Sequence, residues 1–380
     1  MKKWIIPALL FLAVLLVSWL AQPYTLICQE YEGLFLATPD AWARAFSQPL
    51  PLSGIVSDFL IQFYREPFYG ALVSAVLVTA VFLLGRAILS RFGLALDLVP
   101  ALGAAVLWFF LAQASEPKMG VAALFILVLL WLLSLLFPRR KAVTWKADLY
   151  LSAAIVLAAA ALVVFNPKIQ RTERFSRVKR DALYGVWDDL LRTVPPAVAE
   201  KDPELTPFAL LALSGKGELQ TRMFHYPVYD ENDLDMLLYD GKTEYYTSLL
   251  FKACLYQFLG CYNESIHNYY QWATQLSKGT SFVVLRRLVE MYYLLGDYAL
   301  MEKYCRILDH SLMNGRFVHH FRTLASQVPP REPDSPQERA KIPVITHDPF
   351  YNLLLLESNG FDSPMARERI PATLMFRNNQ

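Results

Sequence analysis

The sequence is poor in charged residues and lacks the short motifs that mark common enzyme classes. Asp, Glu, Lys and Arg together make up 18% of the 380 residues, whereas a soluble protein carries about 25%. It contains no P-loop and no G-x-G-x-x-G, H-E-x-x-H or G-x-S-x-G pattern. These absences argue against the nucleotide-dependent enzymes, zinc proteases and serine hydrolases that such motifs identify, and we expect no cofactor.

Histidine and cysteine are also scarce. The six histidines are scattered, and the four cysteines, Cys28, Cys254, Cys261 and Cys305, form no C-x-x-C pair. We therefore expect no metal or redox site and predict that the cysteines are small apolar core residues. The net charge of +2 argues neither for nor against a nucleic-acid partner, and we expect none.

What the sequence does contain is an apolar first half. About five apolar segments precede Asn166, each near the length of roughly 20 residues that a membrane-spanning helix needs. They run over Trp4–Ala21, Tyr69–Leu89, Leu94–Ala112, Met119–Phe137 and Ala147–Phe165. The first could be a signal peptide, but its length and Trp19 favour an uncleaved anchor. Asp97 and Asp148 lie near segment ends, where water and headgroups can solvate them. The sequence thus predicts that residues 1–166 form a transmembrane helix bundle in an all-α fold.

Basic residues in the short loops predict the orientation of the bundle. Lys2 and Lys3, Arg86 and Arg91, and the stretch 139–146 alternate as expected for the cytoplasmic side. We therefore predict a multi-pass membrane protein with its C-terminal domain outside the cytoplasm. The basic run at 168–180 conflicts with this orientation and marks where it is weakest.

Residues 22–68 form the long external loop of that arrangement. Asp40–Phe46 and Gly54–Tyr64 are short amphipathic stretches, with Ser53 as a candidate N-cap for the second. In the second stretch, Ile55, Phe59 and Phe63 share one helical face. Two interpretations stay open: helices lying in the membrane interface, or a lid packed over the bundle.

A self-similar pattern organises the second half. Leu259-Gly260-Cys261-Tyr262 is followed 36 residues later by Leu295-Gly296-Asp297-Tyr298, and each lies between two helical runs. A helix, a glycine turn and a helix at this period are typical of tetratricopeptide-like repeats. We predict a degenerate tetratricopeptide-like α-solenoid over 167–327, a Pro-rich linker over 328–343 and a short helical segment over 344–380.

Helical repeats present surfaces that bind partner proteins, and this half is rich in aromatic residues. Most of them should fill the repeat core, but neighbouring residues diverge on a helix, so the Tyr-Tyr doublets cannot all point inward. Candidates for a partner groove are Tyr246, Tyr270, Trp272 and Tyr293.

Four segments carry a resemblance to a known family. They are Asp58–Tyr64, Pro67–Leu72, Arg222–Pro227 and Asn352–Glu357. They resemble an uncharacterised family of Bacteroides-type polytopic membrane proteins, over most of the chain. The resemblance implies a hydrophobic N-terminal region joined to a helical-repeat region, and it implies no activity. Together with the predicted orientation, it implies a multi-pass protein of a bacterial inner membrane with its C-terminal domain in the periplasm.

The sequence favours a membrane-anchored scaffold, with the bilayer and a protein as its partners, over an enzyme. The alternative is a divergent or truncated polytopic glycosyltransferase that acts on a lipid-linked sugar. Its layout looks similar, with a carboxylate in the first external loop that binds a metal or acts as a base. The candidate carboxylates are Glu30, Glu32, Asp40 and Asp58. A transporter is less favoured, because no apolar segment carries a central charge.

Overall fold

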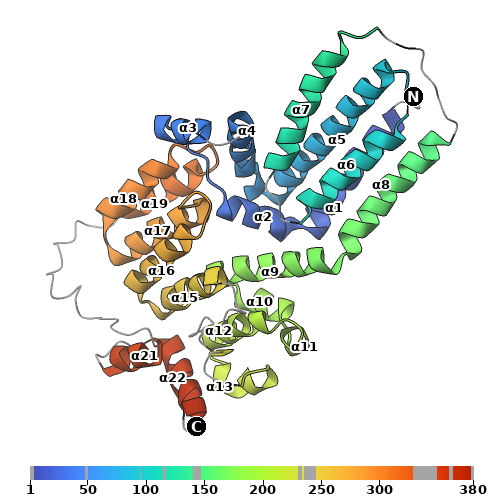
Figure 1. The fold of residues 1–380 in the computed structure, drawn as a ribbon. Coiled ribbons are helices and arrows are strands. Elements are labelled where there is room, and N and C mark those ends of the chain that lie inside the picture. The colour runs from blue at the N-terminus through green and yellow to red at the C-terminus, as the bar shows by residue number, and fades with distance from the viewer. Residues whose placement is uncertain are drawn as a thin grey trace. The chain divides into compact units, whose positions relative to one another are not determined.

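The computed structural model describes residues 4–47, 50–94, 96–113, 117–138, 140, 147–229, 233–234, 245–327, 349–358 and 363–377. Within these residues the chain is helical and contains no β-strand (Figure 1), so the predicted all-α class is confirmed. The chain divides into two compact units. Unit 1 is Met1–Ser176 with His310–Met313, and unit 2 is Arg177–Asp309 with Asn314–Gln380. The predicted linker at 328–343 lies outside the described residues.

Unit 1 contains the apolar helices. Its elements are α1 (Ile5–Ala21), α2 (Pro23–Glu32), α3 (Pro39–Phe46), α4 (Pro51–Ile61), the 3-10 turn η2 (Gln62–Arg65), α5 (Pro67–Arg91), α6 (Leu98–Leu111), α7 (Lys118–Ser134), α8 (Asp148–Phe165) and the first part of α9 (Pro167–Tyr184). Every apolar segment predicted from the sequence is therefore helical.

The interior of unit 1 lies between α1, α5, α6 and α8, which pack against one another. Ile6, Leu10 and Val14 recur every four residues along one face of α1 and are fully buried. They meet Phe82 of α5 and Trp108 of α6, while buried alanines of α6 let the helices approach closely. These helices therefore pack through large apolar side chains that lie next to the small alanines of α6.

The lengths of these helices bear on the predicted number of spans. Two helices, α5 and α8, are long and apolar enough to cross a membrane, and α1 with α2 makes a third if that bent pair counts as one span. Among the described helices, α6 and α7 have only 14 and 17 residues. They reach about 21 and 26 Å at 1.5 Å per residue, short of a hydrocarbon core of about 30 Å. The five-span arrangement therefore stays a prediction.

A buried carboxylate pair explains why α6 begins later than predicted. The carboxylate of Asp148 accepts the backbone N–H groups of Asp97 at 2.8 Å and Leu98 at 3.0 Å. Asp97 in turn pairs with the guanidinium of Arg86 at 2.9 Å. Asp97 and Asp148 are both buried, so the expectation that solvent surrounds them is wrong. The carboxylate of Asp148 caps the first turn of α6 instead, while that of Asp97 is paired with Arg86.

Unit 2 contains shorter helices. They are the end of α9, α10 (Trp187–Thr193), α11 (Pro196–Ala199), η3 (Pro203–Leu205), α12 (Thr206–Lys216), α13 (Leu219–Arg222), η4 (Met223–His225), α15 (Tyr245–Leu259), α16 (Tyr262–Thr274), α17 (Phe282–Leu295), α18 (Tyr298–Leu308), α19 (Gly315–Gln327), α21 (Pro349–Ser358) and α22 (Pro364–Arg377).

Two of its helix pairs are the predicted hairpins. Gly260, with φ of 87°, separates α15 from α16, and Gly296, with φ of 75°, separates α17 from α18. Only glycine adopts this left-handed conformation without strain. Tyr262 and Tyr298 begin the second helix of each pair, and α16 packs on α17. Both glycine turns are confirmed, whereas stacking into a tetratricopeptide-like solenoid stays a prediction.

The last helix is part of unit 2. Helix α22 packs against α12, α13 and α15. Its fully buried Arg369 donates to the Oγ of Ser214 at 3.0 Å and to the carbonyl of Leu234 at 2.5 Å. A buried guanidinium needs such acceptors, so the final helix and α12 depend on each other.

Candidate functional site

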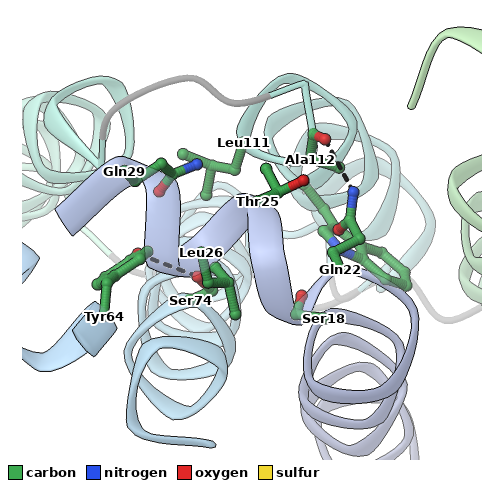
Figure 2. Close-up of a pocket in the computed structure, with 10 residues that line it drawn as sticks. Ser18, Gln22, Thr25, Leu26, Gln29, Tyr64, Ser74, Leu111 and Ala112 are labelled. Atoms are coloured by element: carbon green, nitrogen blue, oxygen red, sulfur yellow. Dashed lines mark hydrogen bonds between the residues drawn. The ribbon is translucent and has the colours of Figure 1, made fainter. Parts of the chain in front are cut away.

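A polar cavity lies at the sharp bend between α1 and α2 (Figure 2). The two helices meet at 81°, because Pro23 has no N–H to continue the hydrogen-bond ladder of α1. The sequence-based prediction ended the first segment at Ala21 and missed that the chain turns directly into another helix. The cavity is lined by Ser18, Gln22, Thr25, Leu26, Gln29, Tyr64, Ser74, Trp108, Leu111 and Ala112.

Hydrogen bonds hold the walls of this cavity. The side chain of Gln22 donates to the carbonyl of Ala112 at 2.8 Å, and the hydroxyls of Tyr64 and Ser74 lie 3.0 Å apart (Figure 2). The indole N–H of Trp108 is buried without an acceptor among the described residues. The cavity volume is about 10 Å³, which is close to what one water molecule needs. This geometry suits a water or a hydroxyl group and excludes an organic substrate.

The N-terminus of α2 is occupied by a carboxylate from α9. Glu173 accepts the N–H groups of Tyr24 at 2.9 Å and Thr25 at 2.8 Å, and the hydroxyl of Thr25 at 2.6 Å. The positive end of the helix dipole favours an anion here. One turn later, the thiol of Cys28 donates to the carbonyl of Ser176 at 3.3 Å. The chain supplies its own anion at this helix end, so these contacts fasten α2 to α9.

The four candidate carboxylates of the external loop lie on three helices. Glu30, fully buried, and Glu32 belong to α2, the exposed Asp40 to α3 and Asp58 to α4. No three acidic, histidine or cysteine residues among the described positions form a group that could hold a metal ion. Asp58 lines a cavity of about 40 Å³ together with Trp42. That volume is far below the several hundred Å³ of a typical ligand site.

The four residues of the predicted aromatic groove have different surroundings. Trp272 is buried in the core, and the half-buried Tyr246 packs on it at 5.4 Å between ring centroids. The side chain of Lys179 covers the Tyr246 ring at 4.6 Å. Tyr293 packs against Phe321 at 5.6 Å. Trp272 therefore serves the core, as expected for most aromatics of this half.

Tyr270 is the most exposed of the four and belongs to a tyrosine cluster. Its hydroxyl is hydrogen-bonded to those of Tyr292, at 3.2 Å, and Tyr304. The rings of Tyr292 and Tyr304 stack with centroids 5.6 Å apart. Tyr304 is buried, so Tyr270 is the exposed member of the cluster and the one suited to a contact surface.

Unit 2 has a larger open cavity that the sequence-based groove did not include. Its volume is about 670 Å³, within the range of ligand and peptide sites. It is lined by Trp187, Ser214, Gly215, Lys216, Gly217, Gln220, Phe258, Pro364, Met365, Arg367 and Glu368. The sequence signal for it was the glycine-rich turn at Leu213–Leu219, but nothing local indicates that α22 would complete the wall.

The aromatic wall of this cavity depends on a glycine. Trp187 packs edge-on against Phe258 with ring centroids 4.6 Å apart. A Cβ at Gly215 would lie 2.4 Å from the indole nitrogen of Trp187, so any larger residue there would displace the indole. The glycine thus lets Trp187 lie directly on α12.

Charges of both signs surround the rim of the same cavity. Lys216 pairs with Asp188 at 2.6 Å and Glu218 at 3.4 Å, and its hydrogen bond lowers the pKa of Asp188. Glu368 accepts the N–H of Leu219 at 3.1 Å. Aromatic side chains in this cavity are thus surrounded by a rim that carries charges of both signs.

The four cysteines are buried and form no disulfide bond, which confirms their prediction as core residues. Burial raises the pKa of the Cys254 and Cys261 thiols to about 12. A cysteine acts as a nucleophile or a metal ligand in its thiolate form, not as the neutral thiol. These two thiols stay neutral at physiological pH and are poorly suited to either role.

Comparison with known proteins places the chain beside one family. The family model described as "Family of unknown function (DUF6057)" matches residues 1–180 and 112–368. The resemblance to an uncharacterised family is therefore confirmed, while its Bacteroides-type membership and tetratricopeptide-like region stay predictions. No curated protein and no solved structure matches the chain.

Proposed function

The chain belongs to the DUF6057 family, whose function is unknown, and we propose that it is a membrane-anchored scaffold. In this proposal the apolar helices of unit 1 hold it in a bacterial inner membrane, and unit 2 binds a partner protein outside the cytoplasm.

The observation that carries the membrane part is the apolar surface of unit 1. Helix α7 buries Gly120, Val121 and Ser134 but exposes Phe125 and Leu129. Exposed large apolar side chains continue over α1, α5, α6 and α8. Soluble monomers rarely expose apolar patches above a few hundred Å², whereas hydrocarbon solvates such a surface at no cost.

Exposed aromatic residues at both ends of α5 support the same conclusion. At one end Trp19 packs on Phe68 at 5.5 Å, beside the exposed Tyr69. At the other, Phe92 lies 5.9 Å from Phe137. The 25 residues of α5 span about 37 Å, a length that matches the separation of the two interfaces of a bilayer at which such rings are enriched.

We keep all five apolar helices as spans in the proposal. The shorter α6 and α7 could be matched by local thinning of the bilayer or by their flanking turns. Arg86 and Arg91 lie in the last turns of α5, and the backbone N–H of Arg140 donates to the carbonyl of Arg91 at 3.0 Å. These three basic residues favour the cytoplasmic side at that end. Five spans then put unit 2 in the periplasm. Part of the basic run at 168–180 is paired, since Arg177 and Arg180 contact the buried Asp181.

The cavity beside Trp187 and Phe258 supports the partner-binding part. Stacked helical hairpins offer extended surfaces for protein segments, and this cavity has the volume and the mixed rim described above. We propose it as the main contact, with the exposed Tyr270 as an additional one. In this proposal unit 2 is a tetratricopeptide-like solenoid.

Two experiments test the scaffold. Reporter fusions after Asn166 should be active only outside the cytoplasm, and a cytoplasmic signal would refute the periplasmic placement. A photo-crosslinking amino acid at Gln220, on the cavity wall, should give a defined protein adduct in cells. The same amino acid at Tyr229, exposed but not lining this cavity, is the control. Equal adducts at both positions would refute the cavity as the contact.

The rival is a polytopic glycosyltransferase that uses a loop carboxylate. It has less support, because the four carboxylates are spread over three helices and the cavity at Asp58 is small. An Asp58→Asn variant that lost all cellular function while folding normally would favour it over the scaffold.

A further inference from the structure

Helix α4 exposes a stripe of apolar residues, and it buries two serines together with Ile55 and Ile61. Leu52, Val56 and Phe59 are 58%, 37% and 36% exposed, whereas Ser53 and Ser57 are each 2% exposed. On a helix that faces water, the reverse distribution is expected. The side that α4 turns away from the protein is therefore its apolar one.

The spacing shows that the exposed apolar residues and the buried serines of α4 lie on two different faces of the helix. Leu52, Val56 and Phe59 follow one another at four and three residues and form one stripe, while Ser53 and Ser57 are one turn apart on another. The hydroxyl of Ser53 donates to the carbonyl of Leu50 at 2.8 Å, and that of Ser57 has no partner among the described residues. Burying a hydroxyl while exposing Leu and Phe is unfavourable in water. The arrangement becomes favourable if an apolar medium covers the stripe.

The structure also changes what the sequence suggested for this stretch. The helix begins at Pro51, so Ser53 is not its N-cap. It ends at Ile61, and the 3-10 turn η2 then alters the periodicity. The predicted face of Ile55, Phe59 and Phe63 is therefore split, with Ile55 buried and Phe59 exposed.

Helix α3 extends the same exposed surface. Trp42 and Phe46 are exposed, and α3 packs on α4. Phe35 joins the two helices, with its ring 6.3 Å from Trp42 and 5.6 Å from Phe59. The apolar residues of α3 and α4 thus form one patch.

This patch continues into the surface that we assign to lipid. Helix α4 packs against α7, whose exposed face is apolar, and leads through η2 directly into α5. The first turn of α5 carries Phe68 and Tyr69, beside Trp19. These are the rings expected at the headgroup level of one leaflet, so α3 and α4 belong to the same level.

We propose that α3 and α4 form an interfacial foot that inserts Trp42, Phe46, Leu52, Val56 and Phe59 into the headgroup–acyl boundary of the bilayer. The inference rests on the proposed membrane location of unit 1. The proposal combines the two interpretations of the external loop, a lid over the bundle and helices in the membrane interface. One side of α4 packs on the other helices as a lid does, and the other side contacts phospholipid.

The test uses the full-length protein reconstituted in phosphatidylcholine vesicles. Nitroxide spin labels are placed by Leu52→Cys and Val56→Cys, in a background whose four native cysteines are replaced by alanine. Collision rates with oxygen, which concentrates in lipid, and with a water-soluble nickel complex are compared. Val76→Cys on the exposed side of α5 serves as the lipid reference, and Tyr229→Cys in unit 2 as the aqueous reference.

We expect labels at 52 and 56 to collide more with oxygen than with nickel, at a depth shallower than position 76. If position 76 behaves as lipid-facing but 52 and 56 behave like 229, the foot is refuted and the membrane anchor stands. If 52 and 56 collide with neither reagent, a protein covers the patch and the inference is also refuted. If position 76 is aqueous, both the anchor and the foot are refuted.

A second measurement needs no cysteine replacement. Lipids brominated near the headgroup end of their acyl chains quench tryptophan fluorescence at shallow depth. Trp42→Phe should remove a measurable part of that quenching, whereas the matched Trp187→Phe in unit 2 should leave it unchanged. Unchanged quenching in Trp42→Phe would refute the foot.

Discussion

Units 1 and 2 are both helical, but they distribute apolar side chains in opposite ways. In unit 2, nine consecutive residues of α12, from Thr206 to Ser214, are buried, and well-exposed large apolar side chains are few. In unit 1, α7 buries glycine and serine and exposes leucines. The comparison shows that the apolar side of a helix is not always the side that packs against the protein. Which side chains are stable on the outside depends on the medium that surrounds the helix.

The interiors differ in the charges that they hold. Unit 2 buries the guanidinium groups of Arg287 and Arg369, each with acceptors from its own helices or neighbours. Around the central α1, α5, α6 and α8 helices of unit 1, the described buried polar groups are mostly neutral, as at Gln22 and Ser74. The charged groups that unit 1 buries are instead carboxylates near the ends of its helices, those of Glu30, Asp97 and Asp148.

The largest expected effect is in the interior of unit 2. Arg287 is 4% exposed, pairs with Glu290 and stacks its guanidinium over Tyr184 at 4.1 Å. Arg287→Ala should lower the free energy of unfolding by about 3–5 kcal/mol, because it leaves a partly buried carboxylate without its partner. Denaturation of the purified protein measures the loss.

The control separates charge from packing. In an Arg287→Ala, Glu290→Ala double variant no unpaired carboxylate remains, so part of the stability should return. Equal instability of the single and double variants would show that the contact with Tyr184, rather than the ion pair, carries the energy.

A matched pair of substitutions tests whether the exposed apolar surface of unit 1 faces lipid. Leu129 in α7 and Leu294 in α17 are 58% and 50% exposed. Leu129→Asp should destabilise the protein in a bilayer by roughly 3 kcal/mol, the cost of an aspartate at the centre of a spanning helix. Leu294→Asp should change stability by less than about 0.5 kcal/mol, as usual for a water-facing surface.

The readout for this pair is the amount of folded protein in the membrane fraction and its thermal unfolding in lipid nanodiscs. Similar small effects at both positions would mean that α7 faces water, and the contrast between the two units would then be lost.

The sequence predicts the elements that depend on local chemistry. The turns at Gly260 and Gly296 followed from one residue type that tolerates a positive φ. The apolar helices followed from their composition, and the buried cysteines from their lack of pairing motifs. In each case, neighbours in the sequence carry enough information.

Features that join distant residues were not predicted. Glu173 caps α2 from 148 residues away, Asp148 caps α6 from 50 residues away, and the cavity beside Trp187 needs α22 to complete it. The bend at Pro23 had a local signal in the proline itself. The inverted face of α4 had none, because its periodicity is the same whichever side faces the protein.

A smaller effect is expected at the α2 cap of unit 1. Glu173→Ala removes the acceptor of two backbone N–H groups and of the Thr25 hydroxyl, and it should cost about 1–2 kcal/mol. Glu173→Gln keeps one acceptor oxygen and should cost less. Hydrogen exchange at the amides of Tyr24 and Thr25 should accelerate in the alanine variant, while that of α17 in unit 2 stays unchanged. Acceleration in both units would instead indicate global unfolding.

The smallest effect is expected at the buried thiol of Cys254 in unit 2. At neutral pH it changes the rate at which the thiol is modified, and it does not change stability. Burial raises the pKa of Cys254 from 9.0 to about 12, so the folded state holds the proton more tightly than the unfolded state. Its contribution to stability is therefore fully present below pH 9 and is lost as the pH rises through about 12. At pH 8, iodoacetamide should leave Cys254 unmodified in the native protein and modify it in urea, as mass spectrometry can measure. Rapid modification of the native protein would show that the interior of unit 2 opens to solvent, and the contrast between the two units would then rest on the surface of unit 1 alone.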